Sequence, residues 1–221
     1  MSGELWRIQR VMRKILGRPA LRICAESELG LSLKSSGAWG LHRLGLIVVA
    51  DAVVDEPVLL NSVIAHEAAH AALSSESELE PDLSGLQVLL ANPWRSWPLH
   101  RGEPWSGHDA RWIRAVCHVV HRAKAWGLVT VTAAVADLSL YGLQSSLSEY
   151  MDALGDEPAA SDWLPLGEAL ARPAPAEFEE LWAADVRRSV VMGSKSERKS
   201  DEFERSGTSA KSGAGRRRRR T

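Results

Sequence analysis

The run His66-Glu67-Ala68-Ala69-His70 is an H-E-x-x-H motif, and it lies in an apolar, alanine-rich stretch whose pattern predicts a helix. Residues four apart on a helix lie one above the other, so His66 and His70 can present both imidazoles to one metal ion. Glu67 lies about 100° around the helix from His66, where its carboxylate can accept a proton from water activated by the metal. The motif therefore predicts half of a zinc site and hydrolytic chemistry.

The residues around the motif have the features of a buried helix. Asp55 supplies an N-cap, Pro57 is tolerated in the first turn, and the polar stretch 74-SSESELEPD-82 ends the helix. The apolar residues in between form a surface broad enough for burial: Leu59, Leu60, Val63, Ile64, Ala68, Ala72 and Leu73. Buried histidines and a buried glutamate are costly unless they are paired, and a zinc ion satisfies that requirement.

Zinc hydrolases usually hold three protein ligands and leave the fourth position to water, so the motif needs a third ligand. The metzincin continuation requires Gly and His shortly after the second histidine, and 71-AALSSE-76 excludes it. A thermolysin-like glutamate is missing from 88-VLLANPW-94. Asp82 and Asp109 stay open as ligands, although each also suits a helix cap.

We favour His108 as the third ligand. It belongs to 106-SGHDARWIRAVCHVVHRAKAW-126, which predicts a helix, and a ligand in the first turn would be held rigidly against the motif helix. His100 is the rival, but it lies in the irregular, tryptophan-rich segment 92–108, and a loop holds a ligand less firmly. The tryptophans of that segment could wall a substrate cleft or cover the core.

The H-E-x-x-H motif followed by Gly107-His108-Asp109-Ala110-Arg111-Trp112 resembles the SprT-like metallopeptidases, relatives of the Spartan-type DNA–protein crosslink proteases. The resemblance covers roughly residues 40 to 125. It implies a small zincin fold in which His66, His70 and His108 bind zinc and Glu67 is the general base. The chain departs from the family in two ways. The connection between His70 and His108 is longer than usual, and the zinc ribbon of some members is absent because the only cysteines are Cys24 and Cys117.

The patterns elsewhere predict an α+β domain over residues 1–193. An amphipathic helix is expected over residues 4–16, and strands or a hairpin within residues 20–50. The clearest strand is 45-GLIVVADAVV-54, directly before the motif helix. In zincins the strand beside the active site commonly lies at a sheet edge, where substrate adds to it, but the pattern leaves open whether this strand is central or at the edge. Residues 128–140 are ambiguous between strand and helix. Ser146 and Glu149 resemble a capping box that begins a short helix, and a further helix is expected over residues 176–192.

Four more residues can be interpreted from the pattern. His118 and His121 lie away from the azimuth of His108 on the predicted helix, so we expect them in packing or at the surface. Tyr141 and Tyr150 are the only tyrosines, and either could polarise a substrate carbonyl.

Composition predicts a protein of the cytoplasm. Two cysteines far apart do not form a disulfide framework, which favours a reducing compartment. The first 20 residues contain Arg and Lys throughout and lack the apolar core of a secretion signal. No apolar run approaches the length that spans a membrane.

Residues 194–221 predict a disordered, arginine-rich tail, because their low apolar content cannot offset the entropy of ordering. Residues 195–221 have a net charge of +6, from ten Lys or Arg and four Asp or Glu, which leaves −7 for the rest of a chain whose total is −1. The five consecutive arginines could bind nucleic acid or an acidic protein surface, or they could only solubilise the chain.

The sequence as a whole predicts a zinc-dependent metallopeptidase with a protein or peptide substrate. Two alternatives stay open. One is a metallohydrolase that acts on an amide or another small molecule at the same site. The other is a binding module for nucleic acid or protein whose zinc is structural; an intact Glu67 and the lack of a fourth Cys or His close to the motif argue against it.

Overall fold

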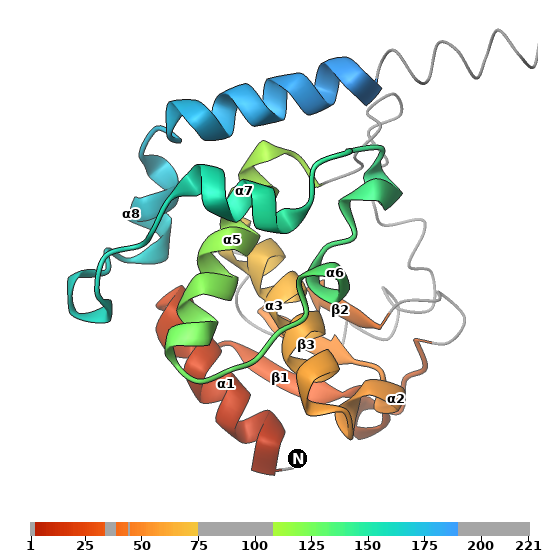
Figure 1. Ribbon diagram of the computed structural model, residues 1–221. Coiled ribbons are helices and arrows are strands. Elements are labelled where there is room, and N and C mark those ends of the chain that lie inside the picture. Colours follow the sequence, from red (N-terminus) through yellow and green to blue (C-terminus); the bar gives the residue numbers. More distant parts are fainter. Residues whose placement is uncertain (1–2, 34–38, 44, 75–107, 190–221) are drawn as a thin grey trace, which may run out of the picture.

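The computed structural model describes residues 3–33, 39–43, 45–74 and 108–189, and these form an α+β fold of mostly helices with one small sheet (Figure 1). The predicted α+β class is therefore confirmed. Asp82, His100 and the predicted tail at 194–221 lie outside the described residues. Among the helices that are described, none is long and apolar enough to cross a membrane.

The elements follow one another in a mixed order. The strands are β1 (Arg22–Ala25), β2 (Gly40–Arg43) and β3 (Leu46–Val49). The α-helices are α1 (Gly3–Leu16), α2 (Asp51–Val54), α3 (Pro57–Leu73), α5 (Ala110–Ala125), α6 (Thr132–Val135), α7 (Leu147–Leu154) and α8 (Leu166–Ala171). Short 3-10 turns are η1 (Glu26–Leu29), η4 (Leu138–Tyr141) and η5 (Ala160–Asp162). Residues 176–189 form a last helix, without a label in Figure 1.

The sheet has the strand order β1-β3-β2. β1 pairs with β3 in parallel, with Ile23 opposite Ile47, and β2 pairs with β3 antiparallel, with His42 opposite Ile47. All four residues of β3 are buried, as expected for a strand that is paired on both sides. β1 and β2 are therefore the two edge strands of the described sheet, and β2 also contacts α3.

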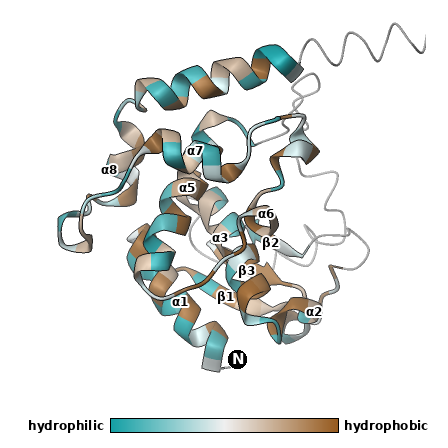
Figure 2. Ribbon diagram, viewed as in Figure 1, coloured by the Kyte–Doolittle hydropathy of each residue, from teal (hydrophilic) through white to brown (hydrophobic). Residues whose placement is uncertain are grey.

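Helix α3 lies in the middle of the molecule, where it contacts β2, β3, α1, α5 and α6 (Figure 1). Its apolar residues are buried all around the helix rather than along one stripe, since neighbours cover it on several sides. Leu60, Ile64 and Ala68 are fully buried in the main core. Figure 2 shows the contrast with α1, whose ribbon is teal over much of its length. The H-E-x-x-H motif thus lies on a helix that is covered on several sides.

Helix α1 confirms the amphipathic pattern predicted for residues 4–16. Its apolar side is buried in the core, and the Gln9 side chain accepts a hydrogen bond from the Ile23 amide (2.7 Å), which ties the helix to β1. On the outer side, Arg10 stacks on Trp6, and Lys14 stacks on the exposed Trp126 that follows α5. Cation–π contacts with tryptophan therefore hold Arg10 and Lys14 in position.

Two local predictions before α3 are wrong. The expected strand 45–54 ends at Val49, and its second half is α2. Asp55 is the C-cap of α2 instead of the N-cap of α3, which begins at Pro57 after Glu56. The physical reason lies outside the segment: the buried Glu26 carboxylate accepts a hydrogen bond from the Asp51 amide (3.1 Å) and so caps the first turn of α2.

The predictions for the C-terminal half are largely confirmed. Ser146 and Glu149 form the capping box of α7, each side chain bonding to the other residue's backbone amide. Residues 176–189 are helical, as expected for that part of the predicted helix over 176–192. The ambiguous segment 128–140 contains α6 and the start of η4, which are joined by irregular stretches.

Candidate metal centre

The structure brings His66, His70 and His108 together. The Nε2 atom of His66 lies 3.3 Å from Nε2 of His70 and 3.4 Å from Nε2 of His108. One ligand atom from each of the three residues lies within 4.8 Å of the others, so the group could hold a metal ion. His66 and His70 come from successive turns of α3, as the H-E-x-x-H spacing predicts, and His108 comes from the chain just before α5.

The position of His108 differs slightly from the prediction. We expected it in the first turn of a helix, but it precedes Asp109, the N-cap of α5, whose carboxylate accepts a hydrogen bond from the Trp112 amide (3.0 Å). The cap uses the Asp109 side chain, so its alternative role as a metal ligand is not needed. His108 is nonetheless held firmly, because it is buried and packs edge-on against Trp112 (centroids 4.3 Å apart).

Backbone contacts orient His66. Its Nδ1 atom lies 2.7 Å from the carbonyl oxygen of Val135 in α6, so Nδ1 carries the proton and Nε2 is left as the donor atom for a metal. The segment that contains Val135 is fixed on α3 by two further side chains. Asn61 donates to the Val129 carbonyl (3.0 Å), and Ser62 accepts from the Val131 amide (2.9 Å). This support was not predicted, although two polar residues inside an apolar helix were a usable signal.

Aromatic rings surround the three histidines. Trp112, which is fully buried, lies 4.9 Å from His66 and 5.4 Å from His70, measured between ring centroids. Tyr141 stacks on His108 with centroids 4.0 Å apart and planes at 18°. These rings restrict the rotamers of the imidazoles, so the nitrogen atoms are held in place before any ion binds.

Burial favours the neutral forms of His66 and His70. It lowers the pKa of His66, although the hydrogen bond to Val135 opposes the shift. Burial lowers the pKa of His70 well below its ordinary value, and charge on His66, His108 and His42 would lower it further. Neutral imidazole is the form that ligates a metal. Three imidazole nitrogen donors held close together fit a borderline-soft divalent cation such as zinc.

Glu67 lies on the side of α3 that faces β2. Its side chain is so close to Gly40 that a Cβ atom at position 40 would lie 2.9 Å from Glu67 Cγ and 2.7 Å from Val63 Cγ1. Burial raises the pKa of Glu67 to about 8, and a hydrogen bond from the His42 backbone opposes the shift. Glu67 is not one of the three residues that are grouped closely enough to share an ion.

The other predicted histidines of α5 serve packing. His118 is buried, and its Nδ1 atom bonds to Glu157, which also accepts a hydrogen bond from Arg122 Nε (2.9 Å). His121 is half-buried. Cys24 and Cys117 are buried free thiols.

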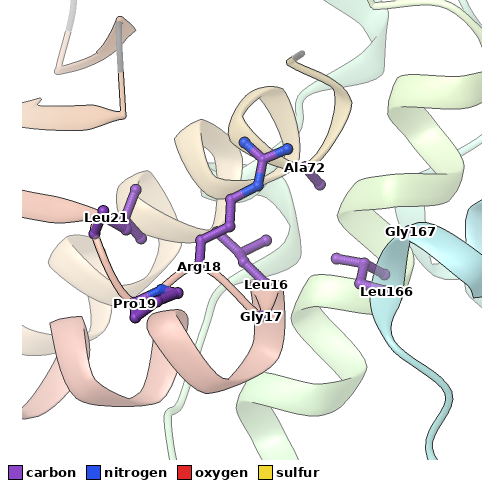
Figure 3. Close-up of a pocket in the computed structure, with 9 residues that line it drawn as sticks. Leu16, Gly17, Arg18, Pro19, Leu21, Ala72, Leu166 and Gly167 are labelled. Carbon is purple, nitrogen blue, oxygen red and sulfur yellow. The ribbon is translucent and has the colours of Figure 1, made fainter. Parts of the chain in front are cut away.

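A separate hollow of about 340 Å³ lies where the end of α1 meets α3 and α8 (Figure 3). Among its lining residues Leu16, Ala72 and Leu166 are apolar, and the Arg18 guanidinium donates to the Ser74 carbonyl (2.8 Å). None of the metal-centre side chains lines this hollow. Its lining offers no acid–base pair.

Comparisons with protein-family models, with curated proteins and with solved structures found no significant match for this chain. The geometry of the site and the motif resemblance are therefore the guides to its function.

Proposed function

We propose that this protein is a zinc-dependent peptidase in which His66, His70 and His108 bind the metal and Glu67 is the general base. The observation that carries the proposal is the convergence of three imidazoles beside one buried carboxylate that is not grouped with them. A structural zinc site normally has four protein ligands, whereas three ligands and an adjacent carboxylate are the donor set of a catalytic site. A bound zinc ion would supply Lewis acidity and lower the pKa of water at the open position.

The residues of the chain divide the remaining work. The His42 backbone bond holds the Glu67 carboxylate in place, and a pKa near 8 lets Glu67 take a proton from water and return it later. A bound cation favours the ionised carboxylate, so the metal would bring this group into its basic form at neutral pH. Glu67 then protonates the departing amine as the C–N bond breaks, and the products are a carboxylate and an amine.

The edge strand favours a peptide over a small molecule as substrate. β2 pairs with β3 on one side, and within the described residues no strand pairs with its other side. An extended peptide can add to such an edge through backbone hydrogen bonds. Glu67 contacts Gly40 of the same strand, so a peptide bound there would run past the general base. This arrangement agrees with the proposed membership of the SprT-like metallopeptidases.

The test combines metal analysis with proteolysis. We expect purified protein to hold about one zinc per chain and to cleave unfolded proteins. Removing the metal with a chelator should abolish cleavage, and added zinc should restore it. Cleavage of small amides without cleavage of unfolded proteins would contradict the peptidase proposal. Parallel reactions with DNA, and with a chain that lacks residues 194–221, test the predicted nucleic-acid contact of the arginine tail.

A further inference from the structure

The two tyrosines of the chain have very different settings. Tyr150 is fully buried, and its hydroxyl donates a hydrogen bond to the Asp185 carboxylate (2.9 Å). Tyr141 is half-buried and stacks on His108 of the metal centre. Within the described residues, no group bonds to the Tyr141 hydroxyl. The Tyr150 hydroxyl therefore has a structural role, whereas the Tyr141 hydroxyl lies at the candidate site and can bond to a substrate.

The turn η4 fixes Tyr141 in this position. The Asp137 side chain accepts a hydrogen bond from the Ser139 amide (3.2 Å) at the start of the turn, and Gly142 ends it with a φ of 77°. Leu138 and Leu143 on either side are buried in the main core. A left-handed residue such as Gly142 reverses the chain at low cost, so the tyrosine is presented from an anchored turn instead of a free loop.

Tyr141 and Glu67 approach the histidines from different elements. Glu67 lies against β2, whereas Tyr141 follows α6, whose Val135 carbonyl orients His66. Tyr141 therefore brings a phenol O–H group, a hydrogen-bond donor, to the histidines from a different element than the carboxylate that accepts the proton.

We propose that Tyr141 is a catalytic residue that donates a hydrogen bond to the oxyanion formed during peptide hydrolysis; this inference rests on the peptidase function proposed above. Water adds to the carbonyl carbon, Glu67 takes its proton, and the electron pair of the C=O double bond moves to the carbonyl oxygen. The Tyr141 O–H group donates to this oxygen without losing its proton. Collapse of the tetrahedral intermediate breaks the C–N bond, and Glu67 gives its proton to the amine.

The matched pair Tyr141→Phe and Tyr150→Phe tests the proposal in the zinc-loaded full chain. Phenylalanine keeps the ring that stacks on His108 and removes only the hydroxyl. Loss of one oxyanion donor typically lowers kcat by about 10²- to 10³-fold, so Tyr141→Phe should show this fall with unchanged KM, zinc content and thermal stability. Tyr150→Phe should lower the melting temperature because Asp185 loses a partner, and it should leave kcat unchanged.

A binding measurement separates transition-state from substrate recognition. A phosphinic peptide resembles the tetrahedral intermediate, so Tyr141→Phe should weaken its binding. An uncleaved peptide should bind with equal affinity to Glu67→Gln and to the double variant that carries both Glu67→Gln and Tyr141→Phe.

The outcomes distinguish the two proposals. If the wild-type chain holds zinc and cleaves nothing, both are overturned. If the wild-type chain cleaves and Tyr141→Phe is equally fast, only the role of Tyr141 is overturned. If Tyr141→Phe loses zinc, the tyrosine supports the metal instead, and its role as oxyanion donor is likewise overturned.

Discussion

Helix α5 connects two histidine clusters that use the same side chain in opposite ways. Next to His118 there are a carboxylate and a guanidinium, Glu157 and Arg122, and both His118 and Arg122 bond to Glu157. Next to His108 there are two other imidazoles, His66 and His70, with nitrogen atoms that converge. A cluster whose charges are balanced inside the protein stabilises the fold. A cluster of converging donors would be completed by a cation from outside, and this difference supports the proposed functional site.

Replacing Glu67, beside one cluster, and Glu157, in the other, with glutamine gives the largest expected difference in kcat. Glu67→Gln should keep zinc and the fold but lower kcat by about 10²- to 10⁴-fold, because an amide cannot accept the proton. Glu157→Gln should leave the kcat of the folded protein unchanged. Zinc stoichiometry, thermal melting and cleavage rates of the two variants provide the measurement. Unchanged cleavage by zinc-loaded Glu67→Gln would refute the general-base assignment.

Removal of the histidines should separate the clusters by metal affinity. Loss of a residue that only supports a ligand typically costs about 10- to 100-fold in affinity, so loss of the ligand in His108→Ala should exceed that range. His118→Ala and His100→Ala should keep zinc. Competition with a chelator measures all three affinities. Metal release by His100→Ala alone would transfer the third-ligand role to His100.

The balanced cluster should dominate stability. Glu157→Gln leaves the buried Arg122 without its charge partner, and breaking a buried pair costs on the order of 3 kcal/mol in the free energy of unfolding. Denaturant unfolding at neutral pH measures the change. An equal loss of stability in Glu67→Gln would contradict the division of roles between the two carboxylates.

The contribution of Glu157 and its partners to stability should also depend on pH in the wild-type chain. Burial opposes ionisation of Glu157, but the hydrogen bond from His118, with the charges of His118 and Arg122, lowers its pKa below the ordinary 4.5. A carboxyl with a lower pKa in the folded state stabilises the fold above its unfolded pKa, and this contribution is lost as the pH falls through the folded value. Melting temperatures below pH 4.5 should therefore fall less steeply with acidification in Glu157→Gln than in wild type.

The smallest expected effect is that of Ser62→Ala, which changes a residue that supports the candidate metal centre only indirectly. Ser62→Ala removes the acceptor of the Val131 amide and should cost about 1 kcal/mol of stability. The bond between His66 and Val135 is separate, so zinc affinity should change by less than the 10-fold typical of a residue that bonds directly to a ligand. A larger loss would show that Ser62 controls the orientation of His66 through the segment 129–135.

The sequence was sufficient where the pattern is local. The helical spacing of His66 and His70, the amphipathic period of α1 and the capping box of α7 each depend on residues within a few positions, and all are present in the structure. The grouping of His108 with the motif could be proposed from helix context, since a zinc hydrolase needs a third ligand.

The sequence was insufficient where the decisive partner is remote. The strand expected over 45–54 ends early because Glu26, far back in the chain, caps α2 through the Asp51 amide. The tautomer of His66 depends on a backbone carbonyl, that of Val135, and every residue has such a group. Tyr141 and Tyr150 could not be distinguished from spacing, because only the fold decides which of them lies beside His108.

His66 and His70 belong to α3, whereas His108 precedes α5, so an ion shared by the three would cross-link two helices. Ion binding and the docking of these helices then form one coupled equilibrium. A ligand at a hundred times its Kd adds about 2.7 kcal/mol to the free energy of unfolding. The supply of metal in a cell would therefore affect how long the folded chain survives degradation. Substitutions of buried residues between α3 and α5, far from the imidazoles, would weaken metal affinity through the same coupling.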